Sequence, residues 1–308
     1  MEPVTTTSIE CQGLRKRYGR TVAVDGLSFT VEPGRVTGFV GPNGAGKSTT
    51  MRMILGLDAP DAGTALVCGQ PYRSLRAPLR RVGALLDAGA IHPGRRARDH
   101  LRWMAQSNGL PPKRVDEVLE AVGLASVARR RAGGFSLGMK QRLGIAAALL
   151  GDAPVLLFDE PVNGLDPEGI HWIRGLLRGL AGQGRAVFVS SHLMSELEDT
   201  ADHLIVVARG RLVADVSVAG LLARASGGRV VLRTARTAEA MAALTAGGAT
   251  VALTGPETLT VTGLTGERIT ALLAGLPFSE LTAYRVSLEQ AYLELTREGA
   301  EYTAARVA

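Results

Sequence analysis

The chain has 308 residues, of which 46% are hydrophobic and 21% charged, and its formal net charge is +6. This length accommodates one large domain or, as we interpret it, two. The longest apolar runs, such as residues 155–158, are far shorter than the ~18 residues of a spanning helix, and residues 1–8 lack the basic and apolar segments of a signal peptide. We therefore expect a soluble, cytosolic protein unless a partner holds it at the membrane.

The positive charge comes mostly from arginines spread along the chain, and only 4% of the residues are aromatic. Because so few aromatic side chains are available to stack on bases, we expect no nucleic-acid partner. Cys11 and Cys68 are too few for a disulfide framework and are expected to be small buried residues. Together with five histidines they show no spacing typical of zinc sites. Metals other than Mg²⁺ are therefore not expected.

The first predicted elements are strands over residues 8–11 and 27–32, with polar turns between them. Tyr18 lies in a basic stretch between these strands. An exposed aromatic residue there either stacks on an adenine face or packs against its neighbours at a strand edge. The residues by themselves leave both interpretations open.

A glycine-rich loop, Gly41-Pro-Asn-Gly-Ala-Gly-Lys-Ser48, follows a predicted strand over 35–40 and precedes a predicted helix over 49–55. It matches the phosphate-binding pattern G-x-x-x-x-G-K-[ST] in its strand–loop–helix context. Glycines allow backbone N–H groups to wrap around phosphate oxygens, and the helix N-terminus attracts the anion. In this pattern Lys47 reaches the β- and γ-phosphates and the Ser48 hydroxyl ligates Mg²⁺. The alternative is a glycine-rich turn that caps an ordinary helix. The residues assigned to nucleotide binding here are Gly41, Asn43, Gly44, Ala45, Gly46, Lys47, Ser48 and Thr49.

Strands are predicted next over residues 63–69 and 82–86, and the second of these ends at Asp87. The spacing of apolar residues becomes helical between residues 97 and 150. Helices are predicted around 99–105, from 111 and over 137–150, the second of them with proline at its start.

An apolar strand predicted over 154–158 ends in two adjacent carboxylates, Asp159 and Glu160. A strand that is apolar on both faces is typical of a parallel sheet, whose carboxyl ends collect active groups. Asp159 fits the Mg²⁺ carboxylate and Glu160 the group that polarises attacking water, whereas the alternative is an exposed Asp-Glu turn. A turn over 163–167 and a helix from Glu168 follow. His192 comes just after another buried strand, at 186–191, where it can contact a γ-phosphate; a lone histidine is otherwise structural.

In order and spacing, these motifs resemble those of the ATP-binding subunit of an ABC transporter, over about residues 8–225. The resemblance rests on the glycine loop, the Phe-Asp-Glu end of the strand at 155–160, the Gly164-Leu-Asp-Pro loop and His192. It implies an α/β fold with a P-loop NTPase, RecA-like core, a small antiparallel β-subdomain and a helical subdomain over about 90–150. It also implies that Tyr18 stacks on adenine and that Asp166 belongs to the nucleotide site.

Two family positions are altered. The signature, normally Leu-Ser-Gly-Gly-Gln, is Phe135-Ser-Leu-Gly-Met139, in which Ser136 and Gly138 keep the hydroxyl and the helix-start backbone that would bind a γ-phosphate. Asp87 stands at the position of the Q-loop glutamine, and an ionised aspartate near Mg²⁺ can only accept hydrogen bonds. Both alterations, and the tail at 287–296, resemble the drug-resistance exporter branch typified by the bacitracin and daunorubicin systems.

The resemblance implies an ATPase that uses ATP and Mg²⁺ as one half of an exporter. Two copies would sandwich two ATP molecules, with Ser136 and Gly138 of one facing the phosphate site of the other. Closing of this homodimer would drive separate polytopic membrane subunits, so the protein would be peripheral on the cytoplasmic side of the cell membrane. The assigned catalytic residues are Lys47, Glu160 and His192, and the assigned metal ligands are Ser48, Asp159 and Asp87.

Two other hypotheses concern the function. An ATPase acting on a ribosome or a DNA machine normally carries two ATPase cores or long insertions, which this sequence does not have. A slow-turnover regulatory module is suggested by Asp87 and by the altered signature, but Glu160 and His192 argue against it.

We place a domain boundary at the linker-like residues 225–228, giving a nucleotide-binding domain over 1–225 and an accessory α+β domain over 226–308. The second domain has the predicted order β-α-β-β-α-β, followed by a helix from Leu288. This order is compatible with a ferredoxin-like domain. Because its sequence contains no cluster of residues that carries chemistry, we favour a packing or dimer-stabilising role, and a regulatory or ligand-sensing role is the alternative.

Overall fold

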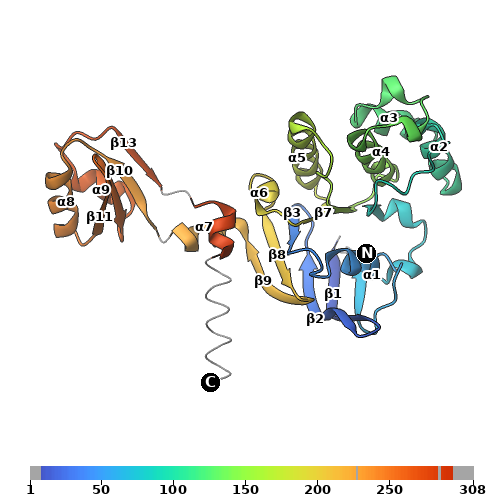
Figure 1. Ribbon diagram of the computed structural model, residues 1–308, viewed down its shortest axis with the longest axis horizontal. Helices are drawn as coiled ribbons and strands as arrows, with labels where there is room; N and C mark the ends of the chain where they lie inside the picture. The colour runs from blue at the N-terminus through green and yellow to red at the C-terminus, as the bar shows by residue number, and fades with distance from the viewer. Residues whose placement is uncertain (1–7, 227, 284–285, 294–308) are drawn as a thin grey trace, which may run out of the picture. The chain divides into compact units, whose positions relative to one another are not determined.

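The computed structural model describes residues 8–226, 228–283 and 286–293. The N-terminal residues 1–7, the predicted end of the last strand at 284–285 and the tail beyond 293 lie outside this description. The chain divides into two compact units, Met1–Ser217 and Val218–Ala308, whose elements are labelled in Figure 1. The division precedes helix α7 (Val218–Ser226), so the boundary predicted at residue 225 lies near the end of that helix.

A three-stranded antiparallel sheet begins the first unit, with the order β2-β1-β4. Its strands are β1 (Ile9–Tyr18), β2 (Thr21–Val31) and β4 (Ala62–Val67). The prediction of polar turns over most of residues 12–26 was wrong, because β1 and β2 continue through them. Polar residues such as Arg15 and Arg17 occupy the exposed positions of β1, while Leu14 and Val24 are buried, as expected for a sheet with one solvated face.

The second sheet of this unit has six strands in the order β5-β6-β7-β3-β8-β9. All neighbours are parallel except β9, which is antiparallel to β8. The strands are β3 (Val36–Val40), β5 (Val82–Leu85), β6 (Val155–Asp159), β7 (Ala186–Ser191), β8 (His203–Ala208) and β9 (Arg211–Ser217). Because β3, β7 and β6 are neighbours, their carboxyl ends meet at one edge, where Val40 pairs with Ser191 and Asp159 with Ser190.

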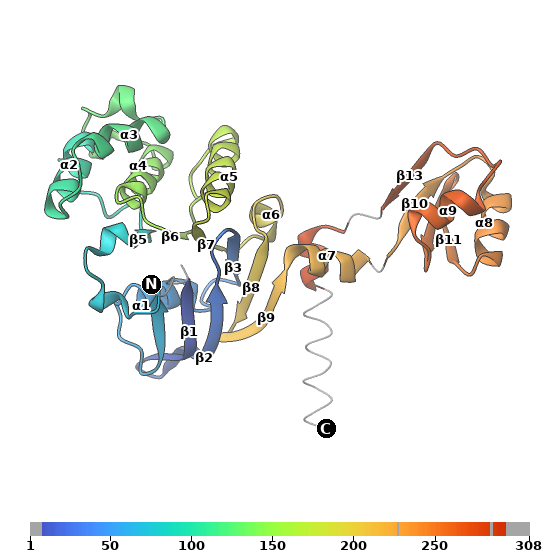
Figure 2. The same cartoon turned by 180° about the vertical axis from the view of Figure 1, so that it is seen from behind.

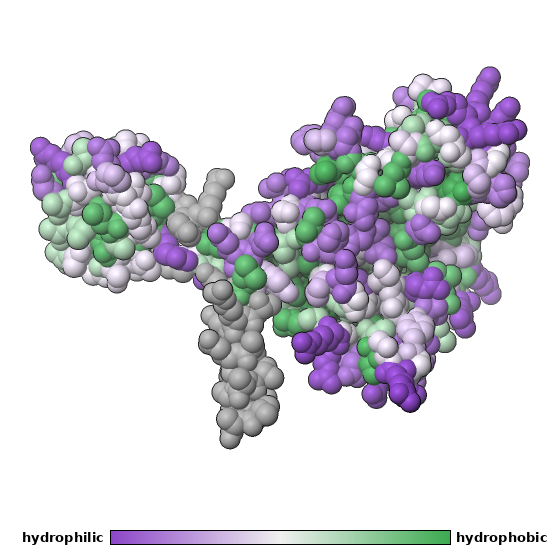
Figure 3. All heavy atoms as spheres, in the orientation of Figure 1, coloured by the Kyte–Doolittle hydropathy of each residue, from purple (hydrophilic) through white to green (hydrophobic). Residues whose placement is uncertain are grey.

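Three helices, α2, α3 and α4, form a group at one end of the first unit, and β1 and β2 lie at the other (Figures 1 and 2). The predicted α/β fold with an antiparallel β-subdomain and a helical subdomain is thus confirmed. On the face drawn in Figure 3, hydrophilic residues gather over the α2–α3 end. The α-helices of this unit are α1 (Lys47–Ile54), α2 (Ala97–Ser107), α3 (Lys113–Ala121), α4 (Leu137–Leu149), α5 (Pro167–Gly182) and α6 (Met194–Leu197). Short 3₁₀ turns are η1 (Tyr72–Ser74), η2 (Pro78–Arg80), η3 (Ala125–Val127) and η4 (Ala132–Gly134).

Aromatic packing joins the two sheets of the first unit. Phe29 of β2 lies 5.6 Å from both Phe39 of β3 and Phe188 of β7, measured between ring centroids. Cys11 and Cys68 are free and buried, as predicted, and burial raises the pKa of both thiols. Among the described residues, no helix has both the length and the apolar character required to cross a membrane.

The second unit carries its own sheet, with the order β11-β12-β10-β13 and antiparallel pairs throughout. Leu232, Leu259 and Val261 from the sheet are buried against Leu244 of α8 and Ile269 of α9. The elements of this unit follow the predicted order β-α-β-β-α-β, which is compatible with a ferredoxin-like domain. The elements are β10 (Val230–Arg233), α8 (Thr237–Ala246), β11 (Thr250–Gly255), β12 (Thr258–Thr262), α9 (Gly266–Leu272), β13 (Glu280–Ala283) and a helix over the described residues 288–293.

Candidate nucleotide-binding site

The glycine loop connects β3 to α1 and approaches neighbouring backbone closely at two of its glycines. A Cβ on Gly41 would lie 2.2 Å from the Val207 carbonyl oxygen, and one on Gly46 would lie 2.4 Å from the Ala23 carbonyl oxygen. Gly46 also has φ of +100°, which side chains of L-residues rarely adopt. The loop therefore requires glycine at both positions.

Lys47 begins α1 and points back across the loop. Its side chain is only 7% exposed, and its Nζ donates to the Gly41 carbonyl at 2.7 Å. The same Nζ lies 3.7 Å from Glu160 Oε1. Ser48 and Asn43 are exposed in the same loop. A buried ammonium group whose partners are the carbonyls of Gly41 and Pro42 and a carboxylate is suited to exchange a carbonyl for a phosphate oxygen.

The ends of β6 and β7 bring Glu160 and His192 together. His192 Nδ1 lies 2.8 Å from Glu160 Oε2, so the two carboxylate oxygens of Glu160 face a histidine and Lys47. Glu160 has φ of +49°, a left-handed conformation that is uncommon outside glycine and that occurs often at functional sites. Lys47, Glu160 and His192, predicted from three separate motifs, therefore form one cluster.

Two buried polar side chains hold the backbone at Glu160, and sequence reasoning missed both. The Ser190 Oγ accepts the Glu160 N–H at 2.9 Å and donates to Asp159 Oδ1. Gln141 Nε2 of α4 donates to the Glu160 carbonyl at 3.2 Å. A polar pair, Ser190 and Ser191, at the end of an otherwise apolar strand was the available signal for Ser190.

Tyr18 is the last residue of β1; it is half exposed, and its hydroxyl group is hydrogen-bonded. The hydroxyl donates to Asp58 Oδ2 at 2.7 Å, and Arg52 forms two hydrogen bonds to the same carboxylate. Arg52 and then Tyr18 lower the pKa of Asp58 to about 2, while Asp58 raises the pKa of Tyr18. A side-chain hydrogen bond with Thr49, near the start of α1, has the opposite effect and lowers the pKa of Tyr18. The ring thus stands beside the first turn of α1.

Four assigned residues make local contacts. Asp87 is exposed, and its Oδ1 accepts the Gly89 N–H at 2.6 Å. Asp166 caps α5 through the Gly169 N–H, and Ser136 caps α4 through the Met139 N–H. A Cβ on Gly138 would lie 2.9 Å from the Gly164 carbonyl oxygen.

These contacts tie the signature to its own helix and to the loop before α5. Ser136 contacts the first turn of α4 and Gly138 lies against Gly164, and neither of these contacts involves Lys47. Within one chain, the signature and the glycine loop therefore form separate parts of the candidate site.

The oxygen ligands at the strand ends fit Mg²⁺. Magnesium is usually held by one or two protein oxygens together with substrate phosphates and water, rather than by a complete protein cage. Within the described part of the chain, no three or more His, Cys, Asp or Glu side chains are grouped closely enough to hold a metal ion by themselves. The Ser48 hydroxyl is exposed, and Asp159 uses Oδ1 for Ser190 while no protein partner is found for its Oδ2 among the described residues.

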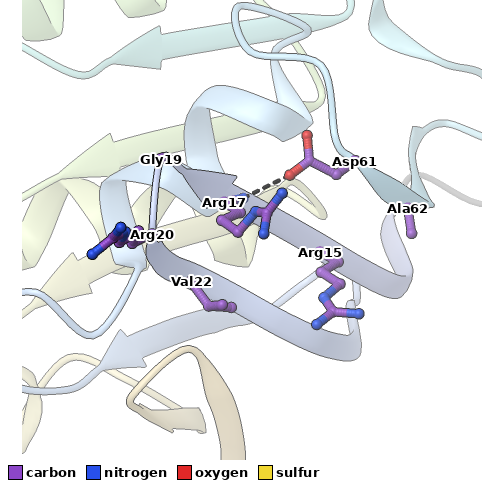
Figure 4. A pocket seen from close by; sticks show the side chains of 7 residues that line it. All are labelled: Arg15, Arg17, Gly19, Arg20, Val22, Asp61 and Ala62. Carbon is purple, nitrogen blue, oxygen red and sulfur yellow. Dashed lines mark hydrogen bonds between the residues drawn. The ribbon is translucent and has the colours of Figure 1, made fainter.

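An arginine-lined hollow lies on the outer side of the β-subdomain (Figure 4). Val22 and Ala62 line it together with Arg15, Arg17 and Arg20, and Asp61 accepts the Arg17 N–H. Successive strand residues point to opposite faces of a sheet, so Arg17 and Tyr18 face opposite ways. This hollow is therefore distinct from the side of β1 that carries the Tyr18 ring.

Comparisons with known proteins agree with this geometry. Residues 24–163 match the family model described as ABC transporter, and residues 228–289 match a domain of unknown function. The bacitracin transport ATP-binding protein BcrA of Bacillus licheniformis is 42% identical over 214 residues, which cover 68% of this chain and 70% of that protein. The Nod factor export ATP-binding protein I of Paraburkholderia xenovorans is 40% identical over 229 residues, covering 73% and 75%.

A solved structure entitled "Structure of ATP binding subunit of ABC transporter" is 27% identical and superposes with a TM-score of 0.64. The match covers 71% of this chain and 92% of that one. Together, the glycine loop, the Glu160 cluster and these relatives establish that the chain belongs to the ATP-binding proteins of the ABC transporter family, which are transport ATPases and include the bacitracin branch.

Proposed function

We propose that this chain binds and hydrolyses ATP to power a separate membrane subunit that exports a drug-like or lipid-like compound. The proposal rests on one observation above all: Lys47, Glu160 and His192 converge at the mouth of the glycine loop. Export is supported by the names of the two relatives, one a bacitracin transporter component and the other a Nod factor exporter component.

The chemistry assigns a distinct task to each side chain. Glu160 would orient water in line with the leaving phosphate, and His192 would hold the Glu160 carboxylate through its 2.8 Å contact. Lys47 would give up the Gly41 carbonyl and donate to phosphate oxygens as negative charge develops. Ser48 and Asp159 would hold Mg²⁺, which neutralises charge on the phosphates when bound.

A second copy completes this proposed site. Ser136 and Gly138 contact their own α4 and the loop at Gly164 rather than the glycine loop. We therefore assign them to the nucleotide bound by the partner copy, where the N-terminus of α4 would meet the γ-phosphate. Closing and opening of this homodimer would move the membrane subunit, and the chain would be peripheral on the cytoplasmic side.

The first test is the rate of phosphate release in the presence of Mg²⁺, for the wild type and for Glu160→Gln. Loss of a group that activates water is expected to lower kcat about 10²-fold or more, while ATP binding measured by calorimetry is retained. Near-normal turnover in Glu160→Gln would remove Glu160 from this role. Negligible turnover of the wild type would favour a slow regulatory module.

The second test concerns the partner. Affinity capture of the chain from detergent-solubilised native membranes is expected to recover a polytopic membrane protein in stoichiometric yield. Recovery of ribosomal or DNA-bound proteins, without a membrane protein, would overturn the exporter proposal while leaving the ATPase.

A further inference from the structure

The hydroxyl group of Ser190 lies between the two carboxylate residues of the candidate site. Ser190 is fully buried in β7 and is paired directly with Asp159 of the neighbouring strand β6. Its Oγ donates to Asp159 Oδ1 and accepts the Glu160 N–H at 2.9 Å. A serine hydroxyl has one proton to donate. Because the Ser190 oxygen accepts from the Glu160 N–H, its own proton is directed to Asp159 Oδ1.

We propose that Ser190 is a positioning residue that sets both the metal-facing oxygen of Asp159 and the left-handed backbone of Glu160. This proposal rests on the proposed function, in which Asp159 holds Mg²⁺ and Glu160 orients water. Hydrogen bonds to metal-ligating carboxylates orient them, and their loss typically weakens metal affinity or activity about 10- to 100-fold. With Oδ1 bound to Ser190, Oδ2 is the oxygen of Asp159 that would remain to hold Mg²⁺.

The backbone of Glu160 needs external support because its φ is +49°. A non-glycine residue in this conformation persists when its surroundings hold it there. Both polar groups of the Glu160 backbone have buried side-chain partners: the N–H donates to Ser190, and the carbonyl accepts from Gln141. The carboxylate, in turn, contacts His192 and Lys47. Removing the Ser190 hydroxyl therefore releases one side of the peptide that aims the Glu160 carboxylate.

Ser191 provides a matched control, because it is the next residue of the same strand and is equally buried. Its hydroxyl contacts Leu193 and Glu196, not Asp159 or Glu160. Substitution of either serine by alanine removes one buried hydroxyl from β7. Ser190→Ala removes the hydrogen bond to the Asp159 carboxylate, whereas Ser191→Ala removes the one to the Glu196 carboxylate.

The experiment measures ADP affinity by calorimetry, with Mg²⁺ and with EDTA, alongside kcat for ATP hydrolysis. In the wild type, Mg²⁺ is expected to tighten ADP binding. Ser190→Ala is expected to lose most of this gain, with ADP affinity in EDTA unchanged and kcat lowered about tenfold or more. Ser191→Ala is expected to keep the Mg²⁺-dependent gain in ADP affinity.

A second pair of variants separates the hydroxyl from the shape of the side chain. Thr and Val have similar volumes, and only Thr carries a hydroxyl. Ser190→Thr is expected to retain the Mg²⁺-dependent gain, and Ser190→Val to lose it. Far-UV circular dichroism verifies that each variant is folded.

Each outcome bears on a different claim. If Ser190→Ala and Ser190→Val keep the Mg²⁺-dependent gain and the wild-type kcat, Ser190 has no positioning role. If the wild type itself hydrolyses no ATP but its Mg²⁺-dependent gain requires the Ser190 hydroxyl, the proposed ATPase role fails and the positioning of Asp159 stands.

Discussion

The Tyr18 ring is fixed at its hydroxyl end by a carboxylate that is already neutralised. Asp58 accepts one hydrogen bond from Tyr18 and two from Arg52. The negative charge beside the Tyr18 hydroxyl is therefore balanced by the Arg52 guanidinium. The Lys16 Nζ lies over the ring, 5.5 Å from its centroid, and 48% of the tyrosine is exposed. A base that stacks there would meet a ring whose orientation is set before binding.

We predict that Tyr18→Phe and Tyr18→Ala differ sharply in nucleotide affinity. Base–aromatic stacking contributes about 1–3 kcal/mol, so Tyr18→Ala is expected to weaken ADP binding about tenfold. Tyr18→Phe keeps the ring and loses only the bond to Asp58, and is expected to bind within about twofold of the wild type. Calorimetric titration with ADP measures both, and wild-type affinity in Tyr18→Ala would show that adenine does not stack on this ring.

The Arg52–Asp58 pair predicts a dependence of stability on acidity. Arg52, followed by Tyr18, lowers the pKa of Asp58 to about 2, from about 4 in an unfolded chain. Because the folded pKa is depressed, the stabilisation is complete above about pH 4 and is lost as the pH falls towards 2. The Arg52 side chain is 47% exposed, so solvent screens the pair and its contribution is small.

Urea unfolding of the wild type and Asp58→Asn tests this expectation. The difference in unfolding free energy between them should be larger at pH 5 than at pH 3. Arg52→Gln should behave in the same way, because it removes the main cause of the shift. A difference that does not change with pH would contradict the assignment.

The residue-scale pattern also explains what the sequence could and could not predict. Lys47 and Glu160 belong to motifs whose residue spacing predicts phosphate binding and hydrolysis. Ser190 and Gln141 act through single hydrogen bonds to backbone or carboxylate atoms, and a sequence contains no record of which strand or helix lies beside which. Their roles depend on the pairing of β6 with β7 and on the approach of α4.

Elements differ in how well their sequence determines them. The buried strand β6 was predicted because every residue before its carboxylates is apolar. The middle of β1 was predicted as turn because its exposed residues, Arg15 to Arg17, are charged, and glycines interrupt the pattern. In the fold, pairing with β2 on one side and β4 on the other overrides these weak local preferences.

Before and after β3, at Gly34 and Gly46, we predict that two glycine substitutions have different consequences. Gly34 and Gly46 both have positive φ, but a Cβ on Gly34 would meet no atom within 4 Å, whereas one on Gly46 would meet the Ala23 carbonyl. Gly34→Ala is expected to cost about 1 kcal/mol of stability and to retain ADP binding. Gly46→Ala is expected to lose at least about tenfold in ADP affinity, since the loop must move.

Calorimetry and urea unfolding on the two proteins make the comparison. Equal ADP affinities in the two variants would mean that the loop accommodates a side chain at residue 46, contrary to the contact with Ala23.

At the scale of the whole molecule, each of the two units has a hydrophobic core of its own among the described residues. The first unit buries a large cluster that includes the three packed phenylalanines, and the second buries a smaller one around Leu232 and Leu259. The order of strands and helices in the second unit was predicted from alternating patterns and turns, because each element there is short and bounded by glycine or proline. Its chemistry was not predictable, since no motif stands in it.

Two separate cores predict two unfolding transitions that can be observed separately. Both tryptophans of the chain, Trp103 and Trp172, lie in the first unit, so their fluorescence follows that unit alone, whereas far-UV circular dichroism follows both. Leu232 is fully buried in the second core, and Leu→Ala at such sites costs about 2–5 kcal/mol.

Leu232→Ala is therefore expected to shift only the transition that circular dichroism detects and fluorescence does not, leaving the fluorescence midpoint in urea and the ADP affinity unchanged. Leu204→Ala, at a fully buried position of the first unit, is the matched control and should lower the fluorescence midpoint. Addition of ADP with Mg²⁺ should raise that midpoint, because a ligand stabilises the unit that binds it. If Leu232→Ala lowers the fluorescence midpoint as well, the two cores unfold as one cooperative unit, and the second unit stabilises the ATPase directly.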